Sequence, residues 1–120
     1  MNTVTNVLIG IIACLHIYFL VLEMFLFTKP WGLKIFRQTL EQAKSSAVLA
    51  ANQGLYNGFL AAGLIWGLVN PSLDVAFQVR VFFLICVVVA GIYGGYSVNK
   101  RIFFIQALPA VLALAFLLMR

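Results

Sequence analysis

The chain has 120 residues, of which 64% are hydrophobic and 9% are charged, and its formal net charge is +5. Ordinary soluble domains are about 45–50% apolar and roughly 25% charged, so this composition predicts a membrane protein and excludes a typical soluble domain. The basic residues cluster between apolar runs and form no patch interleaved with aromatic side chains, so nucleic acid is not an expected partner.

Four apolar runs are long enough to cross a bilayer as α-helices. Each is close to the roughly 20 residues that span about 30 Å of hydrocarbon, and none alternates polar and apolar residues as a barrel strand would. We therefore predict an all-α membrane protein, a single domain over residues 1–120 with four transmembrane helices in an antiparallel bundle. The predicted spans are residues 4–27, 47–69, 75–98 and 102–119.

The first run follows the segment MNTVTN, which lacks the basic residues of a secretory signal, so it is predicted to remain as a span. Residues 31–45, which follow it, carry apolar side chains at helical spacing (Leu33, Phe36 and Leu40) and charged side chains on the other face. This pattern predicts a short amphipathic surface helix between helices 1 and 2, with Trp31 at the headgroup level. We favour a connector over a lipid-sensing or calmodulin-like role.

Small residues recur in the second and third runs, where close helix packing in lipid relies on them. The second run has Ala50, Gly54, Gly58 and Ala62 at four-residue spacing, with Gly63 and Gly67 beyond, and the third has Ala90, Gly91, Gly94 and Gly95. The simplest prediction is a tight contact between these two spans. A ridge facing a second copy of the chain is the alternative, which leaves a homodimer open.

Pro109 lies near the middle of the fourth run, where it removes a backbone donor and is expected to kink the helix. The basic residues give the orientation. Six of them lie in the first and third links, whereas Arg80 and Arg120 lie on the other side. The positive-inside rule then predicts that both termini are extracytoplasmic.

The stretch NQGLYNGF places several polar side chains within the second apolar run. With a rise of about 1.5 Å per residue, His16 and Asn57 fall near the same midplane level, and Glu23 falls about 10 Å further toward the cytoplasmic side. A polar group facing lipid without a partner costs several kcal/mol, so these side chains are predicted to point inward as one cluster. The candidate ligand-binding or proton-relay residues are His16, Glu23, Asn52, Gln53, Tyr56, Asn57, Tyr93 and Gln106.

Glu23 and His16 can carry protons, so the cluster suits a proton relay, a substrate anchor or an acid–base couple. We rank three functions: a protein that binds or transports a small molecule, with proton linkage; a membrane-embedded isomerase or hydratase acting on a lipophilic substrate; and a structural or accessory membrane subunit. Whether the chain is an enzyme stays open, and no catalytic residue is assigned. No cofactor is expected, and one His with one carboxylate makes a metal site improbable.

Two motifs carry a family resemblance. LEMFLF (Leu22–Phe27) and LAANQGLYNGFLAAGLIWG (Leu49–Gly67) resemble a family of small bacterial integral membrane proteins of unknown function. The resemblance covers nearly the whole chain and implies a compact four-span protein of the bacterial inner membrane, surrounded by membrane lipid. It includes Glu23 and the polar residues of the second motif, and it implies no activity.

Overall fold

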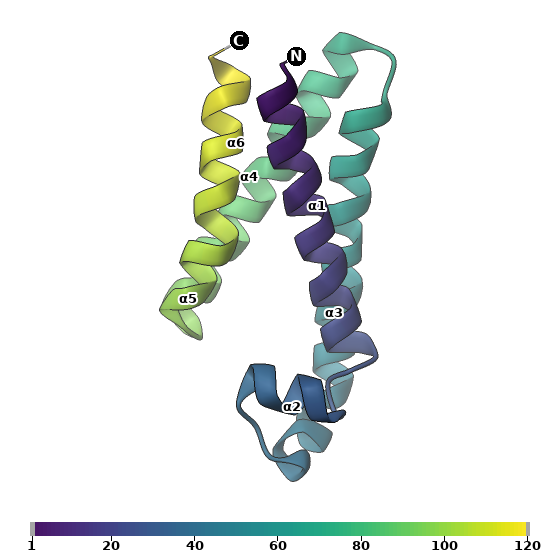
Figure 1. Ribbon diagram of the computed structural model, residues 1–120, viewed down its shortest axis with the longest axis vertical. Helices are drawn as coiled ribbons and strands as arrows, with labels where there is room; N and C mark the ends of the chain where they lie inside the picture. Colours follow the sequence, from purple (N-terminus) through teal and green to yellow (C-terminus); the bar gives the residue numbers. More distant parts are fainter. Residues whose placement is uncertain (1, 120) are drawn as a thin grey trace. The chain divides into compact units, whose positions relative to one another are not determined.

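The computed structural model describes residues 2–119, which form helices joined by short turns (Figure 1). No strand occurs within this range, so the all-α prediction is confirmed. Arg120, counted above among the outer charges, lies outside the described residues. The helices are α1 (Thr3–Met24), α2 (Pro30–Phe36), α3 (Leu40–Val69), α4 (Leu73–Ser97) and a last helix in three parts, α5 (Lys100–Ile102), the π-helical η1 (Phe103–Ala107) and α6 (Leu108–Leu118).

Three helical segments are long and apolar enough to cross a membrane: Thr3–Met24, Leu73–Ser97 and Lys100–Leu118. They are consistent with a membrane protein. The second predicted span lies within α3, which is longer than the others but is not among these three segments. The polar side chains of its NQGLYNGF stretch make the middle of α3 less apolar.

The structure divides the predicted surface helix over residues 31–45 into two parts. Arg37 adopts a left-handed conformation (φ 54°) directly after α2 and ends that helix. Thr39 then starts α3 with a capping box: the Thr39 N–H donates to Gln42 Oε1 (3.0 Å), and the Gln42 N–H donates to Thr39 Oγ1 (3.2 Å). The second half of the predicted surface helix is therefore the first part of α3.

The chain forms two compact units. The first joins the residues up to Cys14 to those from Leu60 onward, and the second comprises Leu15–Phe59. The core of the first unit is a cluster of buried side chains from α1, α3, α4 and α6. Its members are Ile9, Ile12, Ala13, Leu64, Leu84, Val87, Ala110, Ala113 and Leu117.

The small residues of the second and third runs contact the helices we predicted at Gly63 and Gly67 and other helices elsewhere. In the second unit, a Cβ on Gly58 would lie 2.6 Å from Leu20 Cδ1, so this ridge faces α1. In the first unit, a Cβ on Gly91 would lie 2.5 Å from the backbone nitrogen of Ala107, so the α4 ridge faces η1. The predicted contact between the second and third spans is made by Gly63 and Gly67, where an added Cβ would meet Phe83 and Arg80 of α4.

The last helix lies beside α4 as a helical hairpin and accommodates Pro109 through a π-helical segment (Figure 1). The Leu108 N–H donates to the Phe103 carbonyl, which is one residue further back than in an α-helix. Single π turns of this kind occur inside α-helices where the regular ladder is interrupted. The interruption predicted at Pro109 thus takes the form of η1, which ends two residues before the proline.

Candidate functional site

Within the second unit, a carboxyl group and a carboxamide from two helices meet. Asn57 Nδ2, in the middle of α3, donates a hydrogen bond of 2.6 Å to Glu23 Oε1, in the last turn of α1. Both residues are partly buried, so the pair is packed between helices but remains accessible at its edge. Hydrogen bonds that involve a charged group contribute about 1.5–3 kcal/mol in water-soluble proteins, and interhelical ones in membranes average about 0.6 kcal/mol.

Glycine on α3 allows this contact. A Cβ on Gly54 would lie 3.1 Å from Glu23 Cβ and 3.2 Å from the Leu20 carbonyl oxygen, so the α3 backbone lies directly against α1. Gly54 is three residues before Asn57 and Gly58 is one residue after it, so all three lie on one face of the helix. The same face therefore provides both the close approach and the polar group.

The other predicted site residues of the second unit occupy different positions. His16 is fully buried and contacts Phe19 edge to face, with ring centroids 5.3 Å apart. Asn52 and Gln53 are exposed, and Tyr56 is 59% exposed. Gln53 was expected on the face of Asn57 because it lies one turn away. Gly54 takes the position against α1 instead, since a glutamine side chain would keep the two backbones apart.

Two predicted site residues belong to the first unit. Tyr93 is 69% exposed on α4, whereas Gln106 is buried in η1. Of the eight candidates, Glu23 and Asn57 are joined directly by a hydrogen bond.

Sequence reasoning missed a buried arginine in the first unit. Arg80 is 5% exposed; its Nε donates to the Gly67 carbonyl oxygen (2.9 Å) and its Nη1 donates to Asn6 Oδ1 (2.6 Å). It thereby satisfies a carbonyl in the last turn of α3, which has no partner within its own helix. The available signal in the sequence was the position of this arginine well inside an apolar run. An ionisable residue there is expected to face the protein interior and to have a polar partner.

An aromatic contact that the sequence did not predict fixes α2 in the second unit. Trp31 Nε1 donates a 2.9 Å hydrogen bond to the Tyr18 hydroxyl of α1, and Lys34 Nζ lies 5.8 Å from the centre of the Trp31 ring system. Gly32 allows α2 to fold back, because a Cβ there would overlap the Leu26 carbonyl. The connector is thus tied to the end of α1 that carries Glu23.

A family model described as "Protein of unknown function (DUF1304)" matches residues 10–118. The chain belongs to the DUF1304 family. Among curated proteins, it is 30% identical over 116 residues to the uncharacterized protein YpaA of Lactococcus lactis subsp. lactis (strain IL1403), and the match covers 95% of this chain and 96% of that protein. No solved structure matches the chain. The predicted membership of a family of unknown function is confirmed, and the membrane character rests on the helices themselves.

The chemistry available to this DUF1304 chain follows from the polar pair. A carboxyl group accepts hydrogen bonds, binds cations and exchanges protons, and a carboxamide both donates and accepts. Across residues 2–119, no group of three or more His, Cys, Asp or Glu side chains lies close enough to hold a metal ion. The arrangement suits recognition of a small polar group that donates hydrogen bonds or carries positive charge.

Proposed function

We propose that this DUF1304 chain is a multi-pass protein of the bacterial inner membrane that binds or transports a small molecule through the Glu23–Asn57 pair, with proton exchange at Glu23. One observation carries the proposal: a hydrogen-bonded carboxyl and carboxamide lie between two helices of a largely apolar chain. Ionisable groups in membrane helices are rare and most often mark substrate or proton pathways.

The proposal includes four spans in an antiparallel bundle with both termini outside. In this arrangement α3 is the fourth span. Its 30 residues give a helix about 45 Å long, which exceeds the hydrocarbon thickness. Its polar face is compatible with lipid where Asn57 has Glu23 as a partner. Transport further implies a homodimer, because alternating access moves one group of helices against another and four helices in one chain are too few for two such groups.

The test compares the small molecules that co-purify with variants of the full chain in mild detergent. In Glu23→Gln, the side chain keeps an oxygen that can accept from Asn57 but can no longer exchange a proton or carry charge. We expect a compound that is enriched with the parent protein and lost with Glu23→Gln. Glu41→Gln, at an exposed glutamate in the first turn of α3, is the matched control and should retain the compound.

Binding of the identified compound is then measured against pH. The proposal predicts a pH-dependent affinity in the parent protein and a flat profile in Glu23→Gln. Equal recovery of every compound from the parent and Glu23→Gln would refute the binding role. A pH profile that is unchanged in Glu23→Gln would refute proton exchange at this residue.

A structural role is the second candidate, favoured by the contact of Gly54 with the α1 backbone. In that case the pair only holds α1 against α3. It predicts that Asn57→Leu lowers the thermal stability while Glu23→Gln, which retains the acceptor oxygen, has little effect on stability and none on co-purifying compounds. A stable Glu23→Gln protein that has lost its compound contradicts this alternative.

A further inference from the structure

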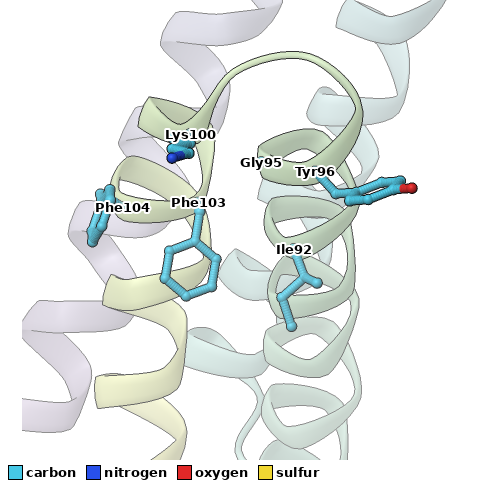
Figure 2. Close-up of a pocket in the computed structure, with 6 residues that line it drawn as sticks. All are labelled: Ile92, Gly95, Tyr96, Lys100, Phe103 and Phe104. Carbon is cyan, nitrogen blue, oxygen red and sulfur yellow. The ribbon is translucent and has the colours of Figure 1, made fainter.

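A recess of about 250 Å³ lies in the first unit between the end of α4 and the start of the last helix (Figure 2). Gly95 lets the last helix approach α4 closely, because a Cβ there would lie 2.7 Å from Phe103 Cβ. Figure 2 shows the Phe103 ring between the two helices, with Ile92 facing it from α4. The lining residues are Ile92, Gly95, Tyr96, Lys100, Phe103 and Phe104.

The recess combines apolar walls with a single charged side chain. Lys100 is the charged lining residue, and Arg101 follows it on the exposed surface. The acidic residue in the sequence of this unit is Asp74, in the first turn of α4. At 1.5 Å per residue, the helix places Asp74 about 30 Å from the recess. The positive charge at the recess is therefore not compensated within the unit.

The surroundings match the boundary between lipid and water. Tyr93 and Tyr96, on the last turns of α4, are 69% and 90% exposed, and tyrosine is enriched at the headgroup level of membranes. The adjoining link carries Lys100 and Arg101, which the positive-inside rule assigns to the cytoplasmic side. A recess at this level has acyl chains on one side and phosphate groups on the other.

The volume of the recess favours a ligand that is an extended molecule with only one part inside the recess. Pockets for compact drug-sized ligands have volumes of about 300–1,000 Å³, so this recess is too small to enclose such a compound. The start of an acyl chain needs only a short apolar groove, and basic pockets between transmembrane helices bind anionic head groups. Uncompensated positive charge beside apolar walls is complementary to an anionic lipid.

We propose that this recess binds one anionic phospholipid, with its phosphate at Lys100 and the beginning of an acyl chain between Ile92 and Phe103. The site is independent of the Glu23–Asn57 pair. It would fix the cytoplasmic end of the helical hairpin to the inner leaflet and make the protein selective for its lipid neighbours.

The test is native mass spectrometry of the full chain in an uncharged detergent, titrated with phosphatidylglycerol or with phosphatidylcholine of the same acyl chains. We expect the first bound phosphatidylglycerol to bind at least fivefold more tightly than phosphatidylcholine. Lys100→Gln should weaken phosphatidylglycerol binding about fivefold, the effect of one surface charge on anionic lipid, and leave phosphatidylcholine binding unchanged. Lys44→Gln, at an exposed lysine on α3, is the matched control and should behave as the parent protein.

Three results would overturn the proposal. Equal phosphatidylglycerol affinity in the parent and Lys100→Gln would remove Lys100 from the site. An equal loss in Lys44→Gln would mean that net charge alone attracts the lipid. Displacement of the lipid by millimolar inorganic phosphate would identify a free-phosphate site that does not use the apolar walls. Because Lys100 is exposed, its substitution is not expected to impair folding.

Discussion

The contact of Gly54 with α1 gives a direct test of how the polar pair is assembled. The substitution Gly54→Ala adds a methyl group that would lie 2.7 Å from Met24 Cγ and 3.2 Å from the Leu20 carbonyl oxygen. The methionine side chain can rotate away, but a backbone carbonyl cannot. We therefore expect α1 to shift away from α3 and the 2.6 Å hydrogen bond between Asn57 and Glu23 to lengthen or break.

The expected magnitude follows from three contributions. Alanine is more favourable than glycine in a helix by up to about 1 kcal/mol. Overpacking a close contact costs about 1–3 kcal/mol, and an interhelical hydrogen bond in a membrane protein is worth about 0.6–1.7 kcal/mol. The unfavourable contributions exceed the gain in helix propensity. We expect Gly54→Ala to lower the free energy of unfolding by about 1–3 kcal/mol, given the overpacking cost.

Gly10→Ala provides the matched control, because a Cβ on Gly10 meets no described atom within 4 Å. The control should leave stability unchanged or raise it by up to about 1 kcal/mol. The assay is reversible unfolding in mild detergent, followed by far-ultraviolet circular dichroism for both variants. If Gly54→Ala is as stable as Gly10→Ala, α1 and α3 are not in contact at Gly54, and the geometric basis of the candidate site is wrong.

Two further predictions concern side-chain contacts that the sequence analysis did not predict. Arg80→Met removes two hydrogen bonds, one of them to the buried Gly67 carbonyl, and should lower the free energy of unfolding by about 1–3 kcal/mol. Arg101→Met, at an exposed position, should leave stability unchanged. A more stable Arg80→Met protein would mean that the cost of burying the charge exceeds the value of its hydrogen bonds. Trp31→Phe and Tyr18→Phe should each speed amide hydrogen exchange in α2 several-fold, because each removes the same hydrogen bond. The double variant should exchange no faster than either single variant. Additive effects on the exchange rate would show that the two side chains do not act as a bonded pair.

The polar pair could be anticipated in part from the sequence. Counting residues from the centre of each apolar run placed Asn57 level with His16 and put Glu23 about 10 Å further toward the cytoplasmic side. In the structure Asn57 bonds Glu23 instead, so the count gave the members of the pair but not their relative depth. The count could not select between Gln53 and Asn57, because both lie on overlapping faces of one helix. The selection depends on which face comes closest to α1, and Gly54 determines that face through its missing side chain.

The break between α2 and α3 also had a local signal. Thr39 and Gln42 have the spacing of a capping box, which marks the start of a helix, and the structure forms both of its hydrogen bonds. The amphipathic spacing of residues 31–45 continues across this break, because Leu40 of α3 follows Phe36 of α2 by four residues. Hydrophobic periodicity alone therefore cannot locate the boundary, whereas capping chemistry can.

The helical hairpin formed by α4 and the last helix follows a simple rule of position. In antiparallel helices joined by a short link, residues at equal distances from the link lie at the same height, because both helices rise by the same amount per residue. Gly91 is eight residues before Asn99 and Ala107 is eight after it, and these two residues are in contact. Gly95 and Phe103, each four residues from Asn99, are also in contact. The short link thus assigns the glycine ridge of α4 to the last helix. The same rule gives no partner for Glu23, because α2 and its turns separate α1 from α3 by a path whose geometry the sequence does not define.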